Sequence, residues 1–229
     1  MSQKTKVNYR SEDGQEIEIT PLVEKVLTAE EQAKLTPDIV IQSLKDGNTR
    51  FLNNNLTARD HNAQVRMATN GQYPKAVILS CLDSRIPVED VFDKGIGDLF
   101  VARVAGNFIN EDILGSMEFG CKVAGSKLIM ILGHEHCGAV KAAVDNVKLG
   151  NITAMLSKIR PVVEKLQDYK GDKTSANEEF VHMVCEHNVK KAITDIREKS
   201  SILKEMEDSG EIKIVGGVYD MDTGKVDFI

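Results

Sequence analysis

Two short, continuous apolar runs, residues 75–80 and 127–132, constrain the fold of this chain more than any other feature. Runs of this kind are typical of strands that are buried on both faces of a parallel sheet. Side chains that can bind a metal follow each run: Cys81 after the first, and His134 and Cys137 after the second. In open α/β sheets, ligands bind beyond the carboxyl ends of the strands. We therefore expect the sheet to bring these three side chains to one point.

Two thiolates and one imidazole form a donor set that suits zinc. A catalytic zinc typically keeps three protein ligands and an open fourth position. His134 and Cys137 are three residues apart, which suits a turn or a first helical turn that clamps one ion. This spacing alone is a weak signal, but its pairing with a Cys-x-Asp-x-Arg sequence after a strand is much stronger. The sequence thus predicts one zinc ion per subunit.

Asp83 and Arg85 follow Cys81 at intervals of two residues. If the chain stays extended there, the three side chains share one face. Asp83 would then either bind the metal as a fourth ligand or accept a proton from a metal-bound water. A bidentate pair with Arg85 would keep Asp83 off the metal and leave the fourth position open. The residues alone leave both arrangements open.

Other histidines and cysteines have simpler interpretations. His182 and Cys185 repeat the His-x-x-Cys spacing, but within a long amphipathic helix pattern, where residues three apart share a face anyway. His136 could compete with His134 as a ligand, although His134 follows the strand and its glycine directly. We expect the side chains of His61 and His187 to be solvated. Cys121 and Cys185 should be plain buried thiols.

Strand and helix patterns alternate along the rest of the chain. They predict strands over residues 98–104 and 211–219, helices over residues 111–123, 138–148 and 178–199, and a terminal hairpin that ends with residues 226–229. Such alternation is typical of sheets covered by helices. We therefore expect an α/β fold with a central, mostly parallel sheet flanked by helices and a C-terminal hairpin.

The N-terminal region divides at a clear helix start. Thr36 and Pro37 are typical of the cap and the first position of a helix, and Gly47 should weaken that helix by roughly 1 kcal/mol relative to alanine. We assign residues 36–229 to a single α/β zinc-enzyme domain and residues 1–35 to an N-terminal arm. The arm either packs on a neighbouring subunit or is a partly ordered tail.

Within the arm, residues 21–27 could form one or two helical turns.

Composition excludes several classes of partner. The net charge is −6 and no block of five or six like charges occurs, which argues against nucleic acid as a main partner. No apolar stretch approaches the roughly 20 residues of a membrane span. The N terminus lacks the apolar segment of a secretory signal, so we expect a cytoplasmic protein, or a periplasmic one if a signal peptide has been cleaved.

Three motifs together resemble the β-class carbonic anhydrases. They are 81–85 (Cys-Leu-Asp-Ser-Arg), 100–107 (Phe-Val-Ala-Arg-Val-Ala-Gly-Asn) and 133–138 (Gly-His-Glu-His-Cys-Gly), and the similarity runs from about residue 36 to the C terminus. The resemblance implies zinc binding by Cys81, His134 and Cys137, with Asp83 and Arg85 as a gating dyad. It also implies a homodimer or homotetramer with active sites near the subunit boundary. The substrate pocket would be lined by Val104, Gly106, Asn107, Gly138 and Phe119, the last from a neighbouring subunit.

The activity implied by this resemblance is the reversible hydration of carbon dioxide to bicarbonate and a proton. Zinc-bound hydroxide would attack carbon dioxide, Asp83 would orient it, and Arg85 would hold Asp83 off the metal. Two thiolates neutralise the zinc charge, so the water pKa should fall less than with three histidines, and activity should rise above neutral pH.

Two features depart from family patterns. The chain has no tryptophan, the residue that some members use to hold a non-catalytic bicarbonate, and Ile78 stands near that position. Plant-type members place a substrate-binding glutamine after the first motif, where this chain offers Lys94 as a substitute. Two other functions remain open: hydrolysis of a related small substrate such as carbon disulfide, and a closed structural zinc site that includes Asp83.

Overall fold

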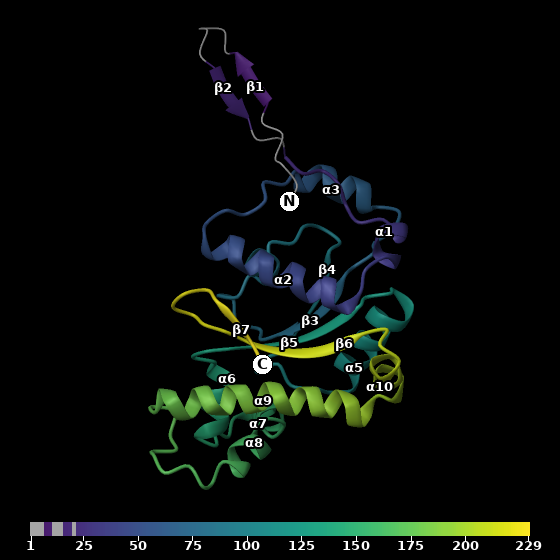
Figure 1. Ribbon diagram of the computed structural model, residues 1–229. Coiled ribbons are helices and arrows are strands. Elements are labelled where there is room, and N and C mark those ends of the chain that lie inside the picture. Colours follow the sequence, from purple (N-terminus) through teal and green to yellow (C-terminus); the bar gives the residue numbers. More distant parts are fainter. Residues whose placement is uncertain (1–6, 11–15, 20–21) are drawn as a thin grey trace.

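The computed structural model describes residues 7–10, 16–19 and 22–229. A five-stranded sheet with the order β4-β3-β5-β6-β7 forms its centre (Figure 1). The first four strands in this order are parallel, and β7 pairs antiparallel with β6. This confirms the mostly parallel sheet with a C-terminal hairpin. The strands are β3 Ala76–Ser80, β4 Leu99–Arg103, β5 Leu128–His134, β6 Lys213–Tyr219 and β7 Val226–Phe228.

Helices cover both faces of the sheet (Figure 1). Helices α1–α3 lie on one side, and the labelled helices from α5 to α10 lie on the other. Their bounds are α1 Ala29–Ala33, α2 Pro37–Leu52, α3 His61–Ala68, α4 Val88–Val91, α5 Glu111–Glu118, the π-helix Phe119–Val123, α6 Gly138–Val144, α7 Gly150–Leu156, α8 Arg160–Lys165, α9 Glu178–Lys199 and α10 Ser201–Asp208.

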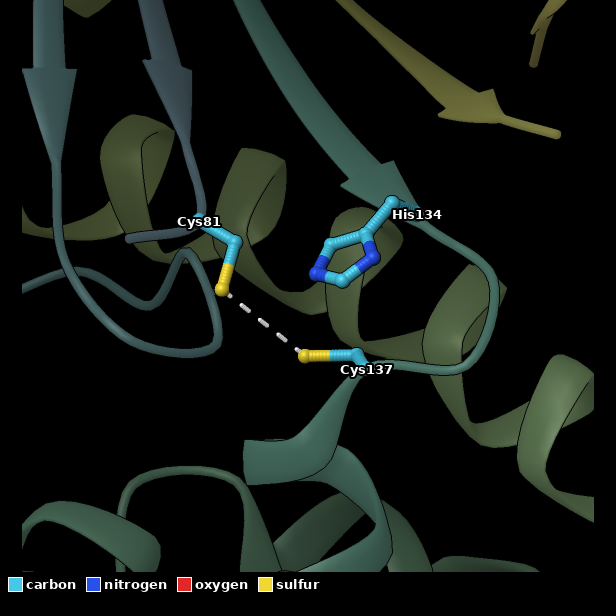
Figure 2. Close-up of side chains that lie close together, drawn as sticks. All are labelled: Cys81, His134 and Cys137. Atoms are coloured by element: carbon cyan, nitrogen blue, oxygen red, sulfur yellow. Dashed lines mark hydrogen bonds between the residues drawn. The ribbon is translucent and has the colours of Figure 1, made fainter. Parts of the chain in front are cut away.

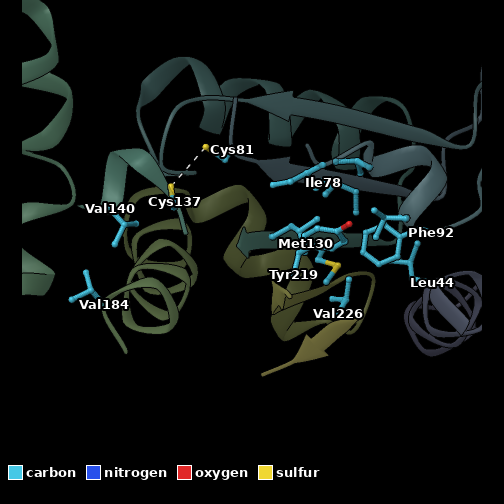
Figure 3. Close-up of a cluster of buried hydrophobic side chains, with 14 of the residues drawn as sticks. Leu44, Ile78, Cys81, Phe92, Met130, Cys137, Val140, Val184, Tyr219 and Val226 are labelled. Atoms are coloured by element: carbon cyan, nitrogen blue, oxygen red, sulfur yellow. Dashed lines mark hydrogen bonds between the residues drawn. The ribbon is translucent and has the colours of Figure 1, made fainter. Parts of the chain in front are cut away.

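The continuous apolar runs of β3 and β5 arise because both faces of these strands are buried. Alternate side chains such as Ile78 and Met130 pack with Leu44 of α2 in one cluster (Figure 3). Their neighbours, Leu79 and Ile131, belong to a second cluster that includes residues of α9. A strand with one solvated face would alternate polar and apolar residues, whereas these strands have no solvated face.

Helix α2 begins as predicted, with the Thr36 hydroxyl accepting a hydrogen bond from the Ile39 N–H at 3.3 Å. Close packing explains why this helix contains a glycine at position 47. A Cβ added to it would lie 1.8 Å from the carbonyl oxygen of Phe92. The glycine therefore allows the helix to contact this backbone closely, and the contact explains why a residue with low helix propensity stands there.

One local expectation was wrong, and two other local features were not predicted. Residues 22–27 contain no helix; instead Val23 forms a parallel bridge with Arg59, and only α1 is helical in this part of the arm. Further towards the N terminus, β1 (Val7–Arg10) and β2 (Glu16–Ile19) form a separate antiparallel pair. Helix α10, capped by the Ser200 hydroxyl, was not predicted.

No helix among the described residues is long and apolar enough to cross a membrane.

A buried carboxylate, Asp93, joins α2 to the segment after α4. Its side chain is fully buried and forms ion pairs with Arg50 and, at 2.6 Å, with Arg59. Thr57 donates hydrogen bonds from its hydroxyl at 2.7 Å and from its backbone N–H at 3.0 Å. Burial alone would raise the pKa of this carboxyl, but these donors outweigh burial and lower the pKa to about 2.

Replacing Asp93 with asparagine should lower the free energy of unfolding by roughly 2–4 kcal/mol, since it leaves two guanidinium groups without their counter-charge. This loss of stability should be smaller than the loss expected for a fully buried ion pair, because the Arg50 side chain is 36% exposed. Urea unfolding measures this loss of stability, with Asp90→Asn, at an exposed position in the preceding helix, as the matched control.

The folded pKa of Asp93, about 2, lies below the unfolded value of about 3.9. The difference between wild type and Asp93→Asn should therefore be full above about pH 4 and shrink as the pH falls towards 2. Equal stabilities at neutral pH would contradict this account.

Candidate metal centre

Three predicted donors meet at the carboxyl ends of β3 and β5. Cys81 directly follows β3, His134 is the last residue of β5, and Cys137 immediately precedes α6. The two sulfurs are 3.9 Å apart, and the donor atoms of all three residues lie within 4.8 Å of one another. Figure 2 shows the imidazole ring and both sulfurs directed towards a common point. The sheet topology therefore produces the convergence that the strand ends predicted.

The His134 ring is oriented so that one nitrogen is available to a ligand. Its Nδ1 atom is 2.7 Å from the carbonyl oxygen of Glu135, so we assign the ring proton to Nδ1. The Nε2 atom is buried and has no hydrogen-bond partner among the described residues. Buried polar atoms normally have partners. A metal ion would satisfy this one, and hydrogen bonding through the other ring nitrogen is the usual arrangement for a metal-binding histidine.

The geometry of the sulfurs also fits zinc. Two sulfurs bound to tetrahedral zinc at about 2.3 Å stand about 3.8 Å apart, close to the 3.9 Å seen here. All three donor residues are nearly inaccessible to solvent, with exposed fractions of 5% for Cys81, 0% for His134 and 1% for Cys137. Three donors of this type are the number that leaves a catalytic zinc one open position.

The surroundings of Cys81 favour its ionised form. The hydrogen bond with Cys137 lowers the pKa of the Cys81 thiol to about 4 against the opposing effect of burial, and contacts with His134 and the Gly106 N–H act in the same direction. The Gly106 nitrogen is 3.3 Å from the sulfur. The same contact between the sulfurs, together with burial, raises the pKa of Cys137. One thiolate is therefore readily formed, and the thiolate is the form that binds metals.

Helix α9 supports both halves of the centre from outside. The Cys185 thiol donates to the carbonyl oxygen of His134 at 3.2 Å. One turn further on, the Asn188 amide donates to the carbonyl oxygen of Gly106 at 2.8 Å. These supporting roles were missed in the sequence. The available signal was a polar residue, Asn188, on the buried face of an otherwise apolar helix stripe.

Gly106 itself is required by its backbone. Its φ is +82°, and an added Cβ would lie 2.4 Å from the Ile159 Cδ1 atom. A side chain at this position would thus strain the backbone and displace Ile159. The turn that directs an N–H to the Cys81 sulfur therefore depends on glycine.

Asp83 and Arg85 form a two-pronged ion pair beside the three donors. The Arg85 Nε and Nη2 atoms lie 2.9 and 2.7 Å from the two carboxylate oxygens. This hydrogen bonding lowers the pKa of Asp83 to about 2. One of those oxygens, Oδ2, is 4.0 Å from the His134 Nε2 atom. The carboxylate thus stands next to the candidate metal position while both its oxygens bind the guanidinium.

The backbone does not stay extended between these residues. The Arg85 N–H donates to the Asp83 side chain at 2.9 Å, and the Ile86 N–H reaches the Asp83 carbonyl at 3.4 Å. Asp83 therefore starts a turn in which its own side chain accepts the N–H two residues on. Arg103, from β4, holds this turn by donating to the carbonyl oxygens of Cys81 at 2.9 Å and Ile86 at 2.6 Å. The condition of an extended segment is therefore not met, although Asp83 and Arg85 do meet.

The structure places the expected pocket residues in two groups. Gly106 contacts the Cys81 sulfur, and Asn107 and Val104 lie beside it in the chain, while Gly138 follows Cys137 at the start of α6. The Asn107 side chain is buried, and neither amide atom has a hydrogen-bond partner among the described residues. Phe119 lies apart from this group: it is 55% exposed and packs on Phe100 of the edge strand β4, with 6.4 Å between ring centroids.

The remaining candidates are accounted for individually. His182 is half-exposed and pairs with Glu135 at 3.2 Å, so it does not join the three donors. Cys121 and Cys185 are buried, and His61 and His187 are exposed, as predicted. The suggestion that Lys94 binds substrate was wrong. Its ammonium group is buried and donates to the carbonyl oxygens of Ser43 and Phe92, both at 2.9 Å.

Together, the fold and the site define an α/β protein with a Cys-His-Cys candidate metal centre beyond the carboxyl ends of parallel strands.

A sequence model of the family described as carbonic anhydrase matches residues 76–226. Carbonic anhydrase 2 of Mycobacterium tuberculosis is 35% identical over 192 residues, which cover 80% of this chain and 88% of that protein. A carbonic anhydrase of Mycolicibacterium smegmatis is 32% identical over 187 residues, covering 81% and 90% of the two chains.

Solved structures agree with these sequence matches. The β-carbonic anhydrase CafA of Aspergillus fumigatus superposes with a TM-score of 0.66 at 25% identity, covering 84% of this chain and 89% of that one. One of the tetrameric β-carbonic anhydrases of Sordaria macrospora has the same fold, with a TM-score of 0.64 at 21% identity and coverage of 72% and 84%. The chain belongs to the β-carbonic anhydrase family.

Proposed function

We propose that this protein holds one zinc ion per subunit with Cys81, His134 and Cys137 and catalyses the reversible hydration of carbon dioxide to bicarbonate. The observation that carries the proposal is that the buried Nε2 atom of His134 has no hydrogen-bond partner among the described residues, while a ring nitrogen of this histidine lies within 4.8 Å of two sulfurs. Membership of the carbonic anhydrase family supports the proposed reaction. The two thiolates and the imidazole are donors that suit zinc.

Zinc bound at this site would act as a Lewis acid that makes a water molecule a strong nucleophile near neutral pH. The protein would contribute position and charge. Asp83, ionised because of Arg85, can accept a hydrogen bond from the attacking group through the oxygen that lies nearest His134. Arg85 would keep that carboxylate off the metal by binding both its oxygens. This gating role is supported by the two-pronged contact.

We further propose that Val104, Gly106, Asn107 and Gly138 line the substrate pocket, and that Phe119 reaches it from a neighbouring subunit. Carbon dioxide is small and apolar, so glycines and apolar walls suit it. The buried Asn107 amide lacks a partner among the described residues, so it could hydrogen-bond bicarbonate.

We propose a homodimer or homotetramer, in which a second subunit covers the edge strand β4. Every residue of β4 is only half-buried, although four of its five residues are apolar, and exposed Phe119 packs on Phe100 of this strand. An exposed apolar edge strand of this kind is usually covered. Residues 36–229 would form the catalytic domain and residues 1–35 an N-terminal arm. Within this arm, Val23 and Gln32 contact the domain of their own chain.

The test is to measure zinc content and carbon dioxide hydration on the same sample. Stopped flow at about pH 8.5, above the pKa of ~7 that zinc gives water in three-histidine sites, should give a fast rate. Chelation should abolish it, and added zinc should restore it. The absence of a zinc-dependent rate would reject the proposal. Stoichiometric zinc without that rate would favour a closed structural site, while hydrolysis of carbon disulfide alone would favour the related-substrate alternative.

A further inference from the structure

A second group of metal-binding side chains lies outside the Cys-His-Cys centre. Glu135 and His136 lie in the connection between β5 and α6, and Asp222 lies in the turn between β6 and β7. One donor atom from each of these three residues lies within 4.8 Å of the other two. The β6–β7 turn and the first turn of α9 lie at the same end of the sheet as α6 (Figure 1). We call Glu135, His136 and Asp222 the rim cluster.

Backbone contacts hold the two segments of the rim cluster in place. The Glu135 N–H donates to the carbonyl oxygen of Tyr219, the last residue of β6, at 3.0 Å. The Asp222 N–H donates to the Asp220 side chain at 2.8 Å. His136 has a φ of +53°, a conformation uncommon for a residue with a side chain. The donors therefore come from short connections whose positions are set by the sheet and the turn.

The charges around the rim cluster favour a cation. Glu135 pairs with His182 at 3.2 Å, and His136 lies 3.8 Å from a carboxylate oxygen of Glu178 on α9. Among the described residues, the ion pairs of Glu135 and Glu178 are with these imidazoles, and none joins a rim-cluster carboxylate to lysine or arginine. Three carboxylates and two imidazoles thus gather where, among the described residues, no lysine or arginine forms an ion pair with the carboxylates.

We propose that Glu135, His136 and Asp222 bind a second divalent transition-metal ion, such as Zn²⁺ or Co²⁺. An imidazole with two carboxylates suits these borderline cations, whereas Mg²⁺ and Ca²⁺ prefer all-oxygen sites. His182 would orient the Glu135 carboxylate as an outer partner, since it already contacts Glu135. Because Asp222 is exposed and the other two residues are half-buried, the ion should bind more weakly than one held by the buried Cys-His-Cys centre.

The test is metal stoichiometry, measured on untagged protein that already holds its first zinc ion. Equilibrium dialysis against increasing Zn²⁺ should reveal a second, weaker equivalent in the wild type. Asp222→Asn should lose that equivalent and retain the first ion. His187→Gln, which changes an exposed histidine elsewhere on α9, should retain both and serves as the matched control.

Cobalt provides a readout that does not depend on enzymatic activity. After the zinc has been removed with a chelator, the first Co²⁺ equivalent should produce a sulfur-to-cobalt charge-transfer band. The second should add only weak d–d bands because the rim cluster contains no sulfur. A wild type that binds one equivalent throughout the titration would overturn the proposal. So would an Asp222→Asn variant that binds the second equivalent as tightly as the wild type. Neither outcome bears on carbon dioxide hydration.

Discussion

Replacing Cys81 with alanine should reduce the bound zinc from about one equivalent per chain to nearly none and lower the hydration rate by roughly 10³-fold or more. The sulfur of Cys81 is one of only two soft donors at the centre and lies 3.9 Å from the other. Without it, His134 and Cys137 would leave zinc with two protein ligands, fewer than the three of catalytic sites. Zinc analysis and stopped flow measure the two effects.

The chain offers a matched control for this change. Cys121 is also a buried thiol, but it packs in the cluster behind the sheet with Val77 and Met117. Cys121→Ala should lose some stability through the cavity it leaves, while keeping zinc and activity. Circular dichroism must show that Cys81→Ala is folded. If folded Cys81→Ala bound zinc stoichiometrically and reacted at the wild-type rate, the assignment of Cys81 as a ligand would be wrong.

Replacing Arg85 with alanine should lower the hydration rate by at least roughly 10- to 100-fold, the usual cost of removing an outer partner of a metal site, while zinc stays bound. Arg85 binds both oxygens of Asp83, and one of these oxygens is only 4.0 Å from the His134 Nε2 atom. Once released, the carboxylate can turn to the metal and fill the fourth position. The measurements are rate, zinc content and the cobalt absorption spectrum, which should change with the added carboxylate ligand.

Two further variants make this test specific. Arg85→Lys keeps the charge but not the planar fork, so it should retain intermediate activity. Arg66→Ala removes an exposed arginine on α3 and should leave the rate unchanged. If Arg85→Ala were fully active, Arg85 would have no part in the reaction. If it lost zinc instead, Arg85 would act in holding the metal site together.

The sequence was most informative where a local rule determines the structure. The uninterrupted apolar runs before Cys81 and His134 indicated strands buried on both faces, and both became central strands of the sheet. Thr36 capped the predicted helix because a hydroxyl at this position satisfies a free N–H. In each case the interacting groups are only a few residues apart, so a short segment contains the necessary information.

Predictions failed where the decisive partner is distant in the chain. Val23 is held by backbone contacts with residues 58–60 rather than by helical bonds, which no pattern within residues 21–27 could reveal. Lys94 was a reasonable candidate for substrate binding until its ammonium group was found on two buried carbonyl oxygens. The supporting bonds from Cys185 and Asn188 span 51 and 82 residues, and they depend on how α9 packs against the sheet.

By itself, the sequence determined the types of donor, their places after two strands, and the kind of fold that would carry them. Tertiary structure decided that sulfurs 56 residues apart lie 3.9 Å from each other and that Asp83 binds Arg85 through a turn. It also buried the His134 Nε2 atom with no hydrogen-bond partner in the described part of the chain. It alone also placed Asp222 beside Glu135 and His136. Local patterns reflect interactions between near neighbours in the chain, whereas these distances depend on the packing of strands and helices that close loops many residues long.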